Sequence, residues 1–166
     1  MLYSKGQTIV CKGSGVCEIT DIKKEKFSDR IQNYYVLCPV NEVCPTKIYI
    51  PVSNEEVRLR PLITKEDIFS SVRAVKEEKS LWVEDEKMRE KAFSDILRSG
   101  EFTKIIKLIG DIYKHQNEKK KNGKKLRQSD EHILKEGEKI ISSEFSFVLD
   151  ISPKEVKNFI LKELEG

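Results

Sequence analysis

Apolar and polar residues alternate with a period of two through most of the first sixty positions. Residues 7–12, 15–22 and 46–52 show this alternation, which is typical of strands with one buried face. Residues 34–40 form a continuous apolar run, which favours a strand buried on both faces. Together with residues 56–62, these segments predict five short strands. Short strands joined by short turns indicate a small antiparallel β-barrel of the SH3 or Tudor kind.

Turn-forming residues separate the predicted strands. The sequence KGSG at residues 12–15 passes directly into a β-branched run. A phosphate-binding loop would need a lysine and a serine or threonine after its last glycine, followed by a helix. We therefore interpret this segment as a hairpin turn in which glycine supplies a positive φ. Polar residues 28–33 are expected to form a loop, and Pro51 indicates a strand near a sheet edge.

From about residue 63 the apolar period lengthens to that of an α-helix. Five segments carry an apolar stripe at helical spacing: residues 64–78, 84–100, 101–120, 129–150 and 152–164. Thr64 and Ser152 stand at N-cap positions, and Gly100 stands at an expected helix end. The sequence thus predicts an α+β protein with a β domain over residues 1–62 and a five-helix bundle over residues 63–166.

The composition is that of a charge-rich protein. The chain has 166 residues, of which 36% are charged and 38% apolar, and its formal net charge is +3. It has no apolar run of about 18 residues that would cross a bilayer, and the first residues lack the apolar core of a signal peptide. We therefore expect a cytoplasmic protein without membrane contact. Because the net charge is small, only the distribution of charge can indicate a nucleic-acid partner.

Four cysteines lie near the N-terminus: Cys11, Cys17, Cys38 and Cys44. Their spacing lacks the close pairs of zinc ribbons, and disulfides are not expected without a secretory signal. We interpret them as buried strand thiols. A four-thiolate zinc site or a thiol sensor is the alternative.

Signatures of catalysis are missing from the sequence. His115 and His132 stand outside any metal-binding pattern, so we interpret them as surface residues. The carboxylates alternate with lysines along predicted exposed helix faces, which is typical of solvation and i,i+4 pairing. We predict that the protein is not an enzyme and that it needs no cofactor, metal or small-molecule substrate.

One run of basic residues, KKKNGKKLR, stands apart from the alternating charges. It contains six cations and no acid: Lys119, Lys120, Lys121, Lys124, Lys125 and Arg127. Asn122 and Gly123 are expected to form a turn, which makes residues 119–127 a basic tip between two helices. Clustered cations of this kind neutralise phosphates in salt-sensitive DNA binding. A solvated surface loop is the alternative.

Trp82 is the single tryptophan of the chain and stands just before a predicted helix, among polar residues. A tryptophan in this position either covers the local core or forms an exposed apolar wedge against a DNA base step. The spacing alone leaves both interpretations open.

In their order along the chain, these segments resemble CarD-type bacterial transcription regulators. The resemblance to the RNA-polymerase-interacting domain, a module shared with the transcription-repair coupling factor, is carried by YSKGQTIVCKGSGVCEITDI, YYVLCPV, KIYIPV and VRLRPL. The resemblance to the C-terminal domain is carried by LWVEDEKMREKAFSDILRSGE, GKKLRQSDEHILKEGEKII and SEFSFVLDI. The resemblance covers almost the whole chain, from Leu2 to about Ile151.

The resemblance implies that a Tudor-like domain docks on the β subunit of RNA polymerase. Part of this contact would extend a sheet of the partner by one edge strand. The corresponding positions in this chain are Lys24, Lys26, Lys47 and Tyr49. We expect a monomeric protein that associates with the nucleoid through the polymerase.

The resemblance further implies that the helical domain contacts promoter DNA at the upstream edge of the melted region, largely independent of sequence. Trp82 matches a family tryptophan that wedges into the minor groove and prolongs the open complex. Lys87, Arg89 and the basic tip are the DNA contacts expected beside it. At the start of the fourth helix, where other members use a basic residue, this chain has Glu131, and the lysines of the basic tip are expected to take over that role.

Two functions from other classes remain open. One is a Tudor-like adaptor whose helical domain binds protein rather than DNA, and the other is a cysteine-based zinc or thiol sensor. Charge reversal at Lys120, Lys124 and Lys125 separates the adaptor from a DNA-binding regulator. Replacing the four cysteines with serine would abolish the function of a sensor but only modestly affect a DNA-binding regulator.

Overall fold

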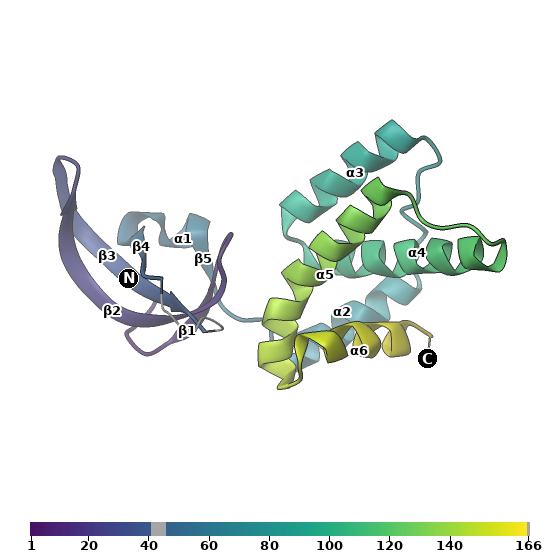
Figure 1. Ribbon diagram of the computed structural model, residues 1–166. Coiled ribbons are helices and arrows are strands. Elements are labelled where there is room, and N and C mark those ends of the chain that lie inside the picture. Colours follow the sequence, from purple (N-terminus) through teal and green to yellow (C-terminus); the bar gives the residue numbers. More distant parts are fainter. Residues whose placement is uncertain (41–45, 166) are drawn as a thin grey trace. The chain divides into compact units, whose positions relative to one another are not determined.

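The computed structural model describes residues 1–40 and 46–165, and Figure 1 shows its helices and strands. The contacts divide the chain into two compact units, Met1–Ile63 and Thr64–Gly166. The first is built on a β-sheet and the second on helices, so the prediction of an α+β fold is confirmed.

The first unit contains one antiparallel sheet with the strand order β4-β3-β2-β1-β5. Its strands are β1 (Thr8–Cys11), β2 (Gly15–Phe27), β3 (Arg30–Pro39), β4 (Ile48–Pro51) and β5 (Leu59–Arg60). The two edge strands, β4 and β5, are short and do not pair with each other, so the sheet is not closed into the predicted barrel. Pro51 ends the edge strand β4, as predicted, and a sheet edge is where proline is tolerated within a sheet.

The glycine-rich segment is a hairpin turn, as predicted. Strands β1 and β2 pair from Thr8–Glu18 to Cys11–Gly15. Gly13 has a φ of 88°, which a side chain would strain. The chain continues into a strand rather than a helix, so no helix N-terminus is available here to bind a phosphate.

Two of the four cysteines lie in the core of this sheet. Cys11 and Cys17 are fully buried with Ile9, Ile19 and Leu37, which supports their interpretation as packing residues. Cys38 is partly buried, and Cys44 lies outside the described residues. Within residues 1–40 and 46–165, no group of three or more metal-binding side chains is arranged around a common point.

The prediction of a loop at residues 28–33 is wrong, because most of this segment belongs to a long two-stranded ribbon. Strands β2 and β3 pair as far as Phe27–Arg30, and the turn between them has Ser28 at a φ of 59°. The ribbon extends well beyond the rest of the sheet (Figure 1). Its charged residues hid the strand pattern, since a ribbon exposed on both faces needs no apolar alternation.

The predicted fifth strand is also shorter than expected. A 3-10 turn, η1 (Val52–Asn54), and a short helix, α1 (Glu55–Arg58), precede β5. Glu55 explains the helical turn, because its carboxylate accepts hydrogen bonds from the Leu2 amide and the Tyr35 hydroxyl. These bonds fix α1 against the N-terminal segment and the centre of the sheet.

The second unit contains the five predicted helices. They are α2 (Lys65–Lys76), α3 (Glu86–Ser99), α4 (Phe102–Lys121), α5 (Gln128–Leu149) and α6 (Pro153–Glu165). The predicted caps are confirmed. The Thr64 hydroxyl accepts a hydrogen bond from the Asp67 amide at 3.1 Å. Ser152 and Glu155 bond reciprocally at the start of α6, and Gly100 ends α3 with a φ of 70°.

Helix α4 is the centre of the second unit and contacts each of the other four helices. Its residues Ile105, Ile106, Leu108 and Ile112 are fully buried, and each contributes about 1.5–3 kcal/mol through burial. Gly110 lets α6 approach closely, because a Cβ there would lie 2.8 Å from the Leu164 side chain. Among the described residues, no helix is both long and apolar enough to cross a bilayer.

Candidate nucleic-acid interface

Trp82 lies in the loop between α2 and α3 and is half-buried. Its indole stacks on the His115 imidazole, with ring centroids 3.6 Å apart and planes 15° from parallel. It also meets the buried Phe93 ring edge-on at 5.9 Å. The ring is thus neither sealed in the core nor fully exposed.

Arg89 lies under this ring rather than on the surface. Its guanidinium carbon is 4.4 Å from the Trp82 ring centroid, and the residue is 4% exposed. Its Nε and Nη2 each donate a hydrogen bond of 2.9 Å to the Asp130 carboxylate. Because its donors are used inside the protein, we do not keep Arg89 among the proposed DNA contacts.

The basic tip connects α4 to α5 (Figure 1). Asn122 caps the end of α4, and Gly123 turns the chain with a φ of 68°, as predicted. Lys119 is half-buried and the other five cations are exposed. No ion pair is formed by the five lysines of the tip with any described residue, so their charges are available to a partner.

The end of the basic tip is attached to the start of α3. Arg127 forms an ion pair with Glu86 in the first turn of α3, and three residues later Asp130 binds Arg89. The structure therefore brings the end of the basic tip and Trp82 to the same end of α3. This proximity was not visible in the sequence, where two whole helices separate them.

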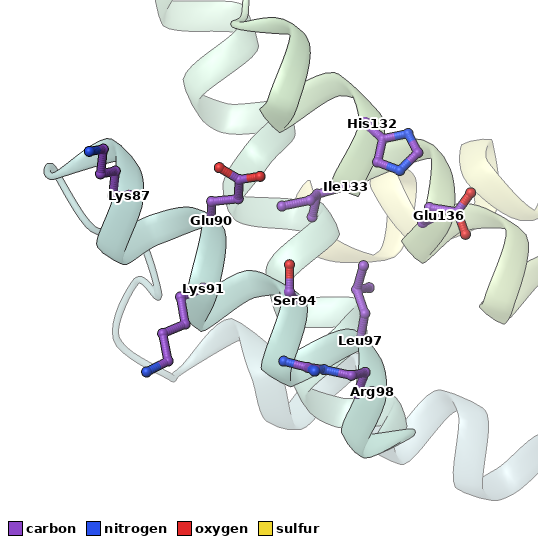
Figure 2. Close-up of a pocket in the computed structure, with 9 residues that line it drawn as sticks. All are labelled: Lys87, Glu90, Lys91, Ser94, Leu97, Arg98, His132, Ile133 and Glu136. Carbon is purple, nitrogen blue, oxygen red and sulfur yellow. The ribbon is translucent and has the colours of Figure 1, made fainter.

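Lys87 lies at the rim of a groove of about 620 Å³ between α3 and α5 (Figure 2). Lys91 and Arg98 belong to the same groove, and the Lys87 and Lys91 amines point away from α5. Glu90 and Glu136 also line it, so its charges are mixed. Of these residues, Lys87 lies closest in sequence to Trp82.

The predicted polymerase contacts fall on two faces of the sheet. Side chains alternate along β2, so Lys24 and Lys26 share one face while Lys23 and Phe27 share the other. Tyr49 on β4 contacts the Phe27 ring at 5.2 Å and therefore lies on the second face. The structure does not bring the two lysines and the tyrosine together on one face. Lys47, just before β4, is exposed.

Sequence reasoning missed an aromatic cluster on the face of Tyr49. The rings of Phe27, Tyr34 and Tyr49 meet edge-to-face, with centroid distances of 5.0 to 6.4 Å. The Lys23 amine lies 5.6 Å from the Tyr49 ring centroid and 3.2 Å from Glu25, whose hydrogen bond raises the pKa of the lysine. The register of the long ribbon, which the sequence did not reveal, creates this cluster.

The outer edge of β2 is open along the ribbon. Strand β1 pairs only with residues Gly15–Glu18 of β2, and no described strand pairs with its outer side from Asp21 to Phe27. Unpaired N–H and C=O groups along such an edge are a template for a further strand.

Comparison with known families gives two matches that together cover nearly the whole chain. Residues 67–161 match the family described as CarD, C-terminal domain, and residues 3–63 match the one described as CarD-like/TRCF RID domain. The chain belongs to the CarD family. A search of curated proteins found no match. CarD-family membership identifies an RNA-polymerase-interacting transcription factor, whose domains are regulatory rather than catalytic.

Proposed function

We propose that this CarD-family protein stabilises the promoter open complex. Acting as a monomer, it binds the polymerase β subunit through its first unit and DNA at the upstream edge of the melted region through its second. The observation that carries the proposal is the environment of Trp82, a half-buried indole held by three neighbouring side chains. A pre-oriented aromatic ring loses little conformational freedom when it inserts at a base step.

The cations near this indole support a phosphate contact. The five lysines of the basic tip carry charges without an internal partner among the described residues, and Arg127 anchors the tip beside the start of α3. Contacts of this kind neutralise phosphates without reading sequence. Lys87 adds one more exposed cation on α3.

The open edge of β2 supports the polymerase contact. A strand of the β subunit that pairs between Asp21 and Phe27 would gain backbone hydrogen bonds. Lys24 and Lys26, on the same stretch, would favour an acidic partner surface. Once the protein is docked, the effective concentration of DNA near the second unit is high, so a weak DNA contact is enough.

Two measurements test the proposal. Calorimetry with a fragment of the β-subunit lobe should show binding to the full chain, because the proposed contact lies wholly on the first unit and needs no DNA. Challenge of a promoter complex with competitor DNA should show a longer open-complex lifetime when the protein is present. The proposal fails if the fragment does not bind or if the lifetime is unchanged at saturating protein.

A further inference from the structure

We infer that Arg89 and Asp111 are positioning residues for Trp82, which they hold by fixing the backbone on both of its sides. The inference rests on the proposed contact of Trp82 with DNA and adds the device that sets the direction of the ring. Neither residue is itself a proposed DNA contact, since both are buried.

Arg89 fixes the chain after Trp82. Its Nη1 donates hydrogen bonds to the carbonyl oxygens of Val83 at 2.9 Å and of Glu84 at 3.2 Å. The other two nitrogens bind the Asp130 carboxylate on α5, and the side chains of this pair are 5% and 2% exposed. The guanidinium thus links the loop to α5 while its carbon lies 4.4 Å from the indole centroid.

Asp111 fixes the chain before Trp82. Its Oδ2 accepts a hydrogen bond of 2.7 Å from the Leu81 amide, and its Oδ1 lies 3.1 Å from the Lys107 amine. This second ion pair is also largely buried and belongs to α4. The residues on both sides of Trp82 are therefore held by buried charges of opposite sign.

Buried ion pairs are better suited to orientation than to stability. Desolvation offsets most of their attraction, so an apolar pair of similar volume would usually stabilise a core equally well. What charged groups add is direction, because each donor and acceptor must meet its partner at hydrogen-bond distance. A shift of the loop would leave a buried charge unsatisfied, so the loop has one favoured position and the indole one favoured orientation.

Fluorescence tests the positioning without DNA, because Trp82 is the only tryptophan of the chain. Arg89→Lys cannot reproduce the forked contacts, so acrylamide quenching of the full chain should increase about twofold. The matched control is Arg98→Lys, in an exposed pair with Asp95 on the same helix, which should leave quenching unchanged. Unchanged quenching in the folded Arg89→Lys protein overturns the inference.

The lifetime of the open complex tests whether the positioning matters for function. Arg89→Lys should shorten it about threefold in the chain with Trp82 and cause no further loss in the Trp82→Ala background, because coupled residues are not additive. Equal shortening in both backgrounds would show that Arg89 acts independently of the indole and would overturn the inference. If Trp82→Ala itself leaves the lifetime unchanged, the proposed function fails, and quenching alone decides the positioning role.

A second variant keeps the test valid if Arg89→Lys does not fold. Asp111→Asn preserves the shape of the side chain and an acceptor for the Leu81 amide, but it weakens that bond and leaves Lys107 unpaired. It should raise quenching and shorten the lifetime only when Trp82 is present. A folded Asp111→Asn protein without either change would contradict the inference.

Discussion

The Trp82 indole lies flat on the His115 imidazole, with 3.6 Å between the ring centroids. This stack joins the α2–α3 loop to the central helix α4, which also supplies Asp111 to the same loop. The histidine therefore contributes to the surface around the indole, although no sequence pattern connects the two residues.

Removing the stacked ring should loosen Trp82. His115→Ala is expected to destabilise the second unit by about 0.5–1.5 kcal/mol beyond the lost burial, as is typical of aromatic pairs. It should also increase acrylamide quenching of the single tryptophan. Urea unfolding and quenching measure the two effects. His132→Ala is the control, because that side chain is exposed on α5 and makes no ring contact with any described residue. Equal changes in stability and quenching in both variants would contradict the stack of His115 on Trp82.

Charge reversal in the basic tip separates DNA binding from a protein-adaptor role. Changing Lys120, Lys124 and Lys125 to Glu should abolish weak duplex binding. Milder changes to Gln should make the slope of log K against log[salt] less steep by about 3, because each phosphate contact that is lost removes roughly 0.9 from its magnitude. Binding to the β-subunit fragment should not change. Titrations at several salt concentrations measure these values.

A matched triple variant serves as the control for the basic tip. Lys135, Lys139 and Lys154 are exposed lysines of the same unit, so their replacement removes the same charge elsewhere. It should change the salt slope much less. If both triple variants weaken DNA binding equally, the binding depends on net charge and not on the basic tip. If the tip variant retains full activity in transcription, the adaptor interpretation is favoured.

The polymerase contact should be sensitive to the open side of the ribbon. Lys24→Glu combined with Lys26→Glu is expected to weaken binding of the β-subunit fragment about tenfold, mainly through slower association. Lys12→Glu with Arg58→Glu changes the same charge in the same unit, at the β1–β2 turn and on α1 rather than on the ribbon, and should have little effect. Calorimetry and stopped-flow mixing distinguish the two pairs. Equal weakening by both would argue against the edge of β2 as the binding site.

The first unit should lose stability in acid through Glu55. Hydrogen bonds from the Leu2 amide and the Tyr35 hydroxyl lower the pKa of this carboxyl below its usual 4.5. The folded protein then binds fewer protons than the unfolded chain near that pH, so its stability is complete above about pH 5 and falls as the pH drops through the lowered value.

Amide hydrogen exchange in the sheet checks this pH dependence. In Glu55→Gln, the protection of the sheet amides should be lower at neutral pH and should change less between about pH 5 and 3. The neighbouring exposed Glu56 provides the control substitution, Glu56→Gln. An unaltered acid response in Glu55→Gln would exclude this carboxyl as its source.

Local patterns in the sequence predicted the helical unit well. Thr64, Gly100 and the Ser152–Glu155 pair act through hydrogen bonds and dihedral angles within a few residues, so their roles could be read from spacing. The strands of the first unit were located where apolar residues alternate. The outer part of the ribbon, where Lys24–Phe27 pairs with Arg30–Asn33, was not located, because its mostly polar residues show no apolar alternation.

The environment of Trp82 depends on contacts between distant positions. The sequence indicated Trp82 and the basic tip by composition, but it could not show that Arg89 bonds to Asp130 or that His115 stacks on the indole. Arg89 resembled an exposed helix cation because a single arginine among acids and lysines has no periodic signal of burial. Only the packing of α3 against α5 reveals its partner.

The lifetime of a promoter open complex with Trp82→Ala, measured at protein concentrations that saturate the polymerase, shows whether the indole stabilises that complex. Polymerase binding, followed separately with the β-subunit fragment, should be the same as for the unchanged chain. We expect the lifetime to fall to nearly that of polymerase alone. A lifetime equal to that of the unchanged chain would rule out a role of the indole in the open complex and would assign Trp82 to the packing of the helical unit.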